Sequence, residues 1–223
     1  MEEFKAQMFK FGPLHEDRHL IDQILRSIPI QTGDIFYRAS DAKGPFGIPF
    51  SQLVAKVTKS EYSHAAMAIV ENGDPYILEI NDQGTLKYRL IDWLDTCYTD
   101  KFSVYRLKEI DDDLRQQIEA EILKILADDP DYDLTFSDPD KFYCTESVAT
   151  VYHRVGISLI EPEIIKDVTS KPVYWILRAG SWICSLFSNT ALDFEQKMYY
   201  VGNDEKGMMS SDKTYCEYYH FKL

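Results

Sequence analysis

Apolar residues follow two patterns along this chain, and each pattern predicts a different kind of element. Spacings of three and four residues, followed by proline or acidic stop signals, predict amphipathic helices over residues 20–28 and 112–127. Short runs rich in β-branched and aromatic residues, bounded by turn residues, predict strands. Strands are expected from Gly33, from His64 and over 76–80, 84–89 and 102–107, with short helices over 51–59 and 91–96. The pattern predicts an α+β fold in which helices pack on a largely antiparallel sheet.

The strongest chemical signal lies at Cys144, where loop-like sequence gives way to a helical stripe. Apolar residues follow it at spacings of four, three and four, namely Val148, Val151 and Val155, and Gly156 closes the helix. Cys144 is therefore expected in the first turn. Unpaired backbone N–H groups and the positive end of the helix dipole stabilise a thiolate there and lower the pKa of the thiol. The alternative is a small buried residue that starts a core-facing stripe.

A histidine suited to serve such a thiolate is His64, which opens a strand of small and apolar residues. A thiolate nucleophile needs an imidazole that shares its proton and later protonates the leaving group. The next strand carries one acid, Glu79, among apolar neighbours, and a carboxylate there is able to hold the imidazole in one tautomer. A satisfied core histidine and an outward-facing glutamate are the alternatives for each residue alone.

The hairpin between these two strands leaves the orienting group open. A simple antiparallel hairpin that turns near Gly73 places His64 opposite Asp82 and Glu79 opposite Ala68, several residues up the strand. Either the hairpin is bulged and Glu79 orients the imidazole, or Asn81 or Asp82 does so.

Four short motifs together resemble the YiiX/YebB-like amidases, which are permuted relatives of the NlpC-type peptidases with a circularly rearranged papain fold. The motifs are Gly33-Asp34-Ile35, Ser63-His64, Ile77-Leu78-Glu79 and Tyr143-Cys144-Thr145-Glu146, within about residues 30 to 160. As in that family, the order along the chain is histidine, acid, cysteine. Thr145, Ser147 and the pair Ala65-Ala66 depart from the residues that are more common there, but small residues remain beside the histidine.

This resemblance implies a role for each residue of the candidate site. Cys144 is the nucleophile, His64 the base and Glu79 its orienting acid. Tyr132, twelve residues before the cysteine, matches a tyrosine that helps to stabilise the oxyanion in the related peptidases, with the Cys144 backbone N–H as companion donor. The implied activity is hydrolysis of a peptide or N-acyl amide bond through an acyl-enzyme. An acyltransferase or thioesterase that uses the same triad on lipid-linked acyl groups is the alternative, and a non-catalytic binding module is a third.

A competing motif, His15-Glu16-Asp17-Arg18-His19, matches the H-E-x-x-H signature of zinc hydrolases. Gly12-Pro13 lies directly upstream, so His15 falls in the first turn of its helix and not inside an established one. The sequence offers no third ligand nearby, since the next candidates are Glu61 and His64. We therefore expect neither a metal nor a cofactor.

Composition sets the outer limits. The chain has 223 residues, 45% apolar content and a formal net charge of −13, which favours one domain with a buried core and argues against nucleic acid and anionic membranes as partners. The expected division is an N-terminal helical extension over 1–29, a catalytic core over 30–160 and a C-terminal decoration over 161–223. In that last part, apolar stretches at 173–177 and 182–187 are too short to span a bilayer. They are expected to pack on the sheet as a helix or to line a substrate pocket.

Cysteine usage and the N-terminus bear on the compartment. Four cysteines, at 97, 144, 184 and 216, show no C-x-x-C pair and no metal-ligand spacing, which suits a reducing compartment. The first residues lack the basic start and apolar run of a secretory signal, so a cytoplasmic location is expected.

Overall fold

A computed structural model of the chain describes residues 26, 28–39, 50–81, 83–95, 101–132, 141–169, 171, 174–175, 178 and 194–222. The H-E-x-x-H motif at 15–19, Cys97, Cys184 and Asp82 lie outside these residues, as does almost all of the helix expected over 20–28. The stretch 182–187 also lies outside them.

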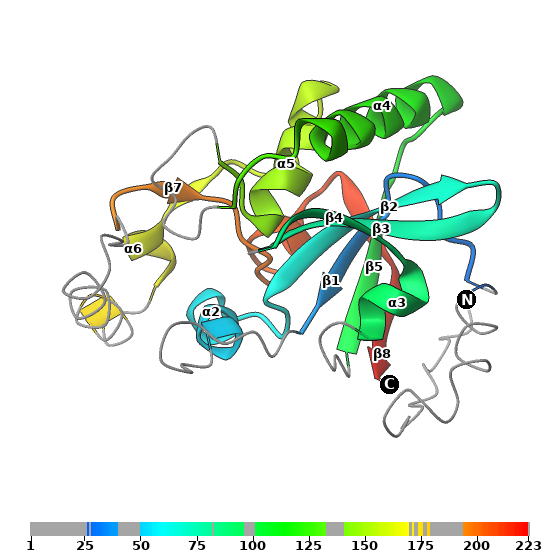
Figure 1. Cartoon of the computed structure of the whole chain (residues 1–223). Helices are drawn as coiled ribbons and strands as arrows, with labels where there is room; N and C mark the ends of the chain where they lie inside the picture. Colours follow the sequence, from blue (N-terminus) through cyan, green and yellow to red (C-terminus); the bar gives the residue numbers. More distant parts are fainter. Residues whose placement is uncertain are drawn as a thin grey trace.

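Six strands form one antiparallel sheet in the order β4-β3-β2-β1-β5-β8 (Figure 1). Five of them were expected from the sequence: β1 (Ile35–Arg38), β2 (His64–Glu71), β3 (Asp74–Asn81), β4 (Gly84–Arg89) and β5 (Lys101–Leu107). The sixth, β8 (Thr214–Lys222), pairs with β5 and was not expected. The α+β fold with helices packed on an antiparallel sheet is confirmed.

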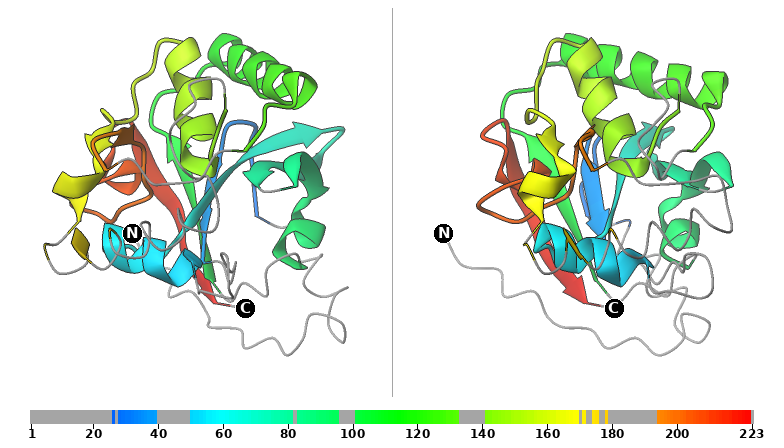
Figure 2. Two further views of the ribbon diagram at one scale, coloured as in Figure 1. Left: turned by 60° about the vertical axis from the view of Figure 1, so that its left-hand side comes forward. Right: turned by 90° about the vertical axis from the view of Figure 1, so that its left-hand side faces the viewer.

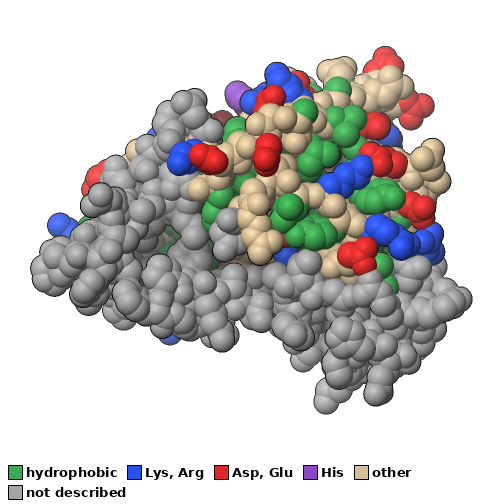
Figure 3. Space-filling view, viewed as in Figure 1, with side chains coloured by type: hydrophobic (Ala, Val, Ile, Leu, Met, Phe, Trp, Pro, Cys, Tyr) green, Lys and Arg blue, Asp and Glu red, His purple; other side chains and the backbone are tan. Residues whose placement is uncertain are grey.

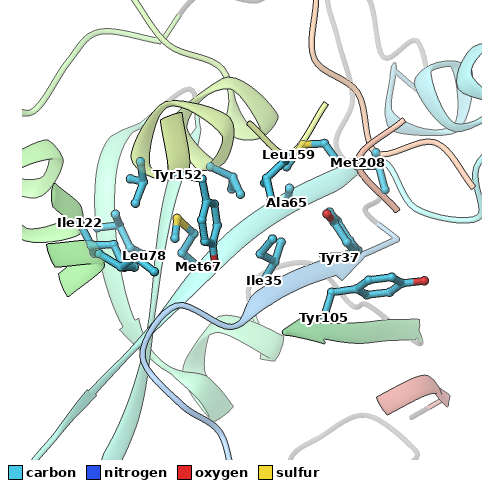
Figure 4. Close-up of a cluster of buried hydrophobic side chains, with 14 of the residues drawn as sticks. Ile35, Tyr37, Ala65, Met67, Leu78, Tyr105, Ile122, Tyr152, Leu159 and Met208 are labelled. Carbon is cyan, nitrogen blue, oxygen red and sulfur yellow. The ribbon is translucent and has the colours of Figure 1, made fainter. Parts of the chain in front are cut away.

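The two faces of the sheet are covered by different helices. The helices α4 (Asp112–Asp128) and α5 (Cys144–Arg154) lie together on one face in all three views (Figures 1 and 2). Side chains of both helices and of β2 and β3 fill this layer, among them Met67, Leu78, Ile122 and Tyr152 (Figure 4). The helix α3 (Leu90–Asp95) packs on the other face, where Trp93 contributes to a second cluster. Burial of both faces explains why β2 reads as an unbroken apolar run.

The hairpin of β2 and β3 differs in register from the sequence-based expectation. Glu71 faces Asp74 across a two-residue turn, and Ala68 faces Ile77, not Glu79. Asn72 and Gly73 both have positive φ, 54° and 84°, which a type I′ turn requires and which an Asn-Gly pair adopts readily. The expectation was wrong because the turn is this tight, and the tight turn draws Glu79 toward the start of β2.

Two features fix α5 against the sheet. Its apolar stripe, Val148 and Val151, is buried against the core, as the sequence predicts, and the Tyr152 hydroxyl donates to the Gly33 carbonyl oxygen just before β1. The neighbouring α4 begins at the N-cap Asp111, whose side chain accepts a 2.8 Å hydrogen bond from the Leu114 N–H. The buried stripe of α5 and the Tyr152 hydrogen bond place the first turn of α5 beside the start of β2.

The remaining described elements are short: α2 (Phe50–Thr58), β6 (Glu163–Ile164), α6 (Ile165–Val168), β7 (Lys197–Met198) and the 3₁₀ helix η2 (Met208–Ser210). Acidic and basic side chains are interspersed over the described part of the face in Figure 3. Among the described helices, none combines the length and the apolar character that crossing a membrane requires.

Candidate active site

The thiol of Cys144 meets three hydrogen-bonding groups at the start of α5. The His64 imidazole is hydrogen-bonded to the sulfur, and the backbone N–H groups of Ala65 and Thr145 donate to it. Thr145 supplies one of the N–H groups that a helix leaves unpaired in its first turn. The structure thus brings together the cysteine and histidine that the sequence singled out.

Ala65 is available to the sulfur because β2 and β3 pair only as far as Met67 and Leu78. The Ala68 N–H donates to the Asp34 carbonyl oxygen beside β1, so N–H groups at odd-numbered positions of β2 point toward β3. The next N–H group on this side of β2 after Met67 is that of Ala65. It has no partner strand at this position and donates to the Cys144 sulfur.

On its other side, the imidazole is held by Glu79. His64 Nε2 lies 2.7 Å from Glu79 Oε2, which leaves Nδ1 as the ring nitrogen for the sulfur. Asn81 donates from Nδ2 to Glu79 Oε1 over 2.9 Å. Glu79 and Asn81 are the two described candidates for orienting the imidazole, and Glu79 is the one that contacts it. Asn81 donates a hydrogen bond to the Glu79 carboxylate instead.

The electrostatics favour a thiolate next to an imidazolium. Burial lowers the pKa of His64, but the attraction of the Cys144 thiolate and of Glu79 is larger and raises this pKa to about 10. Burial likewise raises the pKa of Cys144, and the His64 cation with the two backbone donors outweighs it, so the net shift is downward. Both shifts favour charge separation between the sulfur and the ring.

Two residues around Glu79 were missed by the sequence analysis, Arg38 and Trp93. Arg38 Nη2 lies 3.0 Å from Glu79 Oε2, and Trp93 donates from Nε1 to the same oxygen over 2.6 Å. Burial raises the pKa of Glu79, but His64, Arg38 and Trp93 lower it to about 2. A charged residue at the end of the apolar run Ile35-Phe36-Tyr37 was the available signal, since burial of a cation demands a partner.

Tyr132 lies beside the segment that leads into α5. It forms a parallel bridge with Phe142, and the Phe142 N–H donates to the Asp131 carbonyl oxygen over 3.0 Å. Its side chain is half-buried and packs against the hydrophobic clusters on either side. The bridge places the Tyr132 backbone beside Phe142, which lies two positions before Cys144 in the sequence. The role of the Tyr132 side chain in oxyanion binding remains a prediction.

The residues on either side of Cys144 both bind the backbone of Tyr199. The Tyr199 N–H donates to the Tyr143 hydroxyl oxygen over 2.7 Å, and the Thr145 hydroxyl donates to the Tyr199 carbonyl oxygen over 2.8 Å. These two bonds tie the segment after residue 160 to the start of α5.

Thr145→Val is expected to lower the free energy of unfolding by about 1–2 kcal/mol, because it leaves the Tyr199 carbonyl without the hydroxyl of a buried residue. Urea unfolding followed by circular dichroism measures the change. Valine keeps the methyl group of threonine, so its loss of stability reports the hydroxyl, whereas Thr145→Ser keeps the hydroxyl and removes the methyl. A Thr145→Val variant as stable as the parent would show that packing, not the hydrogen bond, fixes this segment.

A cysteine at a helix start, joined to a histidine and an acid on neighbouring strands, defines a papain-like cysteine peptidase or amidase. The family of permuted papain-like amidase enzymes, YaeF/YiiX, C92 family, matches residues 30–178, and the chain belongs to this family. It is thus an enzyme of the cysteine peptidase and amidase type.

One sequence relative and one solved structure agree with this assignment. The uncharacterized protein YiiX of Escherichia coli strain K12 is 31% identical over 160 residues, which cover 68% of this chain and 75% of YiiX. A crystal structure described as metalloprotein YiiX from Escherichia coli O157:H7 superposes with a TM-score of 0.66 at 21% identity and covers 85% of this chain and 97% of that one. The permuted papain-like fold is confirmed.

Proposed function

We propose that this protein hydrolyses a peptide or N-acyl amide bond with Cys144 as nucleophile, His64 as acid and base, and Glu79 as the orienting acid. The observation that carries the proposal is the continuous chain of hydrogen bonds from the sulfur through the imidazole to the carboxylate. The directions of the three pKa shifts support these roles, because they favour a thiolate, an imidazolium and a carboxylate.

In the proposed reaction, the Cys144 thiolate attacks the carbonyl carbon and forms a carbon–sulfur bond. The oxyanion receives hydrogen bonds from the Cys144 N–H and the Tyr132 side chain. As the carbon–nitrogen bond breaks, His64 gives its proton to the departing amine. Water then attacks the thioester while His64 takes one of its protons, and the acid leaves as thiolate and imidazolium are restored.

The chemistry of the site is compatible with a second outcome, transfer of the acyl group to an acceptor other than water. The same triad forms the thioester in both cases, so an acyltransferase or thioesterase acting on lipid-linked acyl groups is the alternative. Mass spectrometry of the protein with an acyl donor, with and without an added alcohol or amine, separates the two by the product formed. A non-catalytic binding module forms no thioester on Cys144.

The YiiX protein of the similar crystal structure is described as a metalloprotein. In this chain, the described ranges hold no group of three or more His, Cys, Asp or Glu residues that could bind a metal ion. The residues around His64 do not fit one, because the Arg38 guanidinium lies against Glu79 and repels a cation. The proposed reaction therefore uses no metal ion.

We further propose that residues 30–160 form the catalytic core and that residues 1–29 form a helical extension. The hydrogen bonds of Tyr199 to both neighbours of Cys144 support a place for 161–223 beside the substrate, as a wall of its pocket.

Selective alkylation tests the activated thiol without knowledge of the substrate. Cys216 is exposed and Cys144 is half-buried, so an unactivated Cys144 would react no faster than Cys216. A thiol with the ordinary pKa of 9.0 is only about 0.1% thiolate at pH 6, and we expect iodoacetamide to label Cys144 at least about tenfold faster than Cys216. Peptide mass spectrometry reads both rates in one sample. Faster labelling of Cys216 would contradict the proposal.

A further inference from the structure

The guanidinium of Arg38 is almost completely buried, with 2% of its side chain exposed. Arg38 ends β1 and faces His64 in the register of the two strands. One of its nitrogens, Nη1, donates to the Trp93 carbonyl oxygen over 2.6 Å, while Nη2 lies 3.0 Å from Glu79 Oε2, and its Cζ stacks 4.0 Å from the centre of the Trp93 ring. The backbone of β1 and the indole of α3 therefore hold this cation against the carboxylate that binds the imidazole.

Four charges of alternating sign result: the Cys144 thiolate, the His64 imidazolium, the Glu79 carboxylate and the Arg38 guanidinium. They come from α5, β2, β3 and β1 in turn, and α3 adds the neutral N–H of Trp93. Among the described residues, Tyr143 also lies close enough for its charge to act on Cys144, but burial raises the pKa of its phenol, so it stays uncharged at acidic and neutral pH. Without Arg38, two anions would share one imidazolium, and like charges oppose one another most strongly where water is excluded.

A neutral amide orients the histidine in the Cys-His-Asn arrangement of papain-like proteases, so no second anion arises there. Here the third group is a carboxylate. The short contact between Arg38 and Glu79 gives this pair a net charge of zero while its oxygen still accepts from His64.

We infer that Arg38 is a positioning residue that offsets the charge of Glu79 and so stabilises the Cys144 thiolate. The inference rests on the proposed function. Arg38 touches neither the sulfur nor the substrate in this scheme and acts through Glu79. Trp93 supports it by holding both members of the ion pair.

The fold contains a matched control, a second buried ion pair at the opposite end of β1. Arg106 of β5 binds Asp34 through Nε to Oδ1 and Nη2 to Oδ2, each over 2.7 Å, and both side chains are buried. Loss of either arginine strands a buried carboxylate and costs stability. Only Arg38 contacts the acid that binds His64, so only its loss is expected to alter the thiol.

The experiment measures the rate of Cys144 alkylation by iodoacetamide from pH 3.5 to 9 in the whole protein. In the parent, the rate is expected to fall on acidification with a midpoint below the ordinary thiol pKa of 9.0. In Arg38→Met, the midpoint is expected to rise by about one pH unit, so the rate on the acidic side drops about tenfold. Arg106→Met should keep the parent midpoint, and Arg38→Lys, which retains the charge, should shift by less than about half a unit.

Unchanged midpoints in a folded Arg38→Met, or equal shifts in Arg38→Met and Arg106→Met, would overturn the inference and leave the proposed function intact. If Arg38→Met does not fold, Arg38→Gln takes its place, because it removes the charge and keeps a donor for the Trp93 carbonyl oxygen. Its midpoint is expected to rise by about one pH unit, and a midpoint equal to that of the parent would overturn charge compensation. A parent midpoint near that of Cys216 would overturn the proposed function and this inference together.

Discussion

Replacement of His64 by alanine is expected to slow alkylation of Cys144 about 30-fold on the acidic side of the alkylation midpoint. The imidazolium is the largest of the influences that lower the pKa of the Cys144 thiol. Loss of a unit charge about 4 Å from the sulfur costs its anion about 4 kcal/mol at an effective dielectric constant of about 20, which is about three powers of ten in thiolate population. A thiolate of higher pKa is intrinsically more nucleophilic, which returns about half of these powers of ten and leaves the expected ratio.

His153→Ala is the matched control for this prediction. His153 is an exposed histidine in the last turn of α5, the helix that Cys144 begins, so its removal tests for general effects on that helix. Iodoacetamide kinetics read by mass spectrometry, with Cys216 as the internal reference, measure both variants. A His64→Ala rate within twofold of the parent would show that the helix start alone activates the sulfur and that His64 has another role.

Local patterns were sufficient to predict the elements that carry the site. The stripe from Cys144 through Val148 and Val151 predicts α5 because helix periodicity is a property of neighbouring residues, and the structure buries this stripe. The start of β2 at His64 was predicted for a similar reason, since the apolar run and its Asn-Gly boundary are both local.

Pairings between distant segments were not predictable in the same way. The register of a hairpin depends on the number of residues in its turn. The expected pairing of Glu79 with Ala68 implied a turn two residues longer than the observed one, and it therefore placed Glu79 too far from His64. β8 joins β5 across more than 100 residues of sequence, and nothing in its composition names that partner. Arg38 falls in the same class, because its ion pair with Glu79 follows only from the pairing of three strands.

The Cys144–His64 pair is expected to make the free energy of unfolding rise with pH up to about 6.5, stay level to about 9 and then fall. The folded pair binds one proton between the lowered pKa of Cys144 and the His64 pKa of about 10. The unfolded pair binds two protons below the imidazole pKa of 6.5, one up to the thiol pKa of 9.0 and none above. Stability changes with pH by the difference in bound protons, about 1.4 kcal/mol per pH unit for one proton.

Below pH 6.5 the contribution of the pair therefore falls by about 1.4 kcal/mol per pH unit, until the pH reaches the lowered pKa of Cys144. In the parent, stabilisation from the lowered pKa of Glu79 is complete above 4.5 and is lost only as the pH falls through about 2. Urea unfolding of the parent and of Cys144→Ala/His64→Ala at half-unit pH steps gives the contribution as a difference curve. The lost packing of the double variant shifts this curve vertically. The loss of His64 also raises the pKa of Glu79 in the variant, which lowers the difference further toward acidic pH, in the same direction as the pair itself.

Cys216→Ala/His153→Ala removes the same two residue types from exposed positions and serves as control for the difference curve. A flat curve for Cys144→Ala/His64→Ala from pH 5 to pH 10 would contradict the shifted pKa values of the folded pair. The difference curve gives the number of protons bound by the pair and not their position, because a neutral thiol beside a neutral imidazole also holds one proton. The alkylation profile supplies that information, since only the sulfur that has given up its proton reacts. Agreement of the two measurements is what assigns the proton to His64 and the negative charge to Cys144.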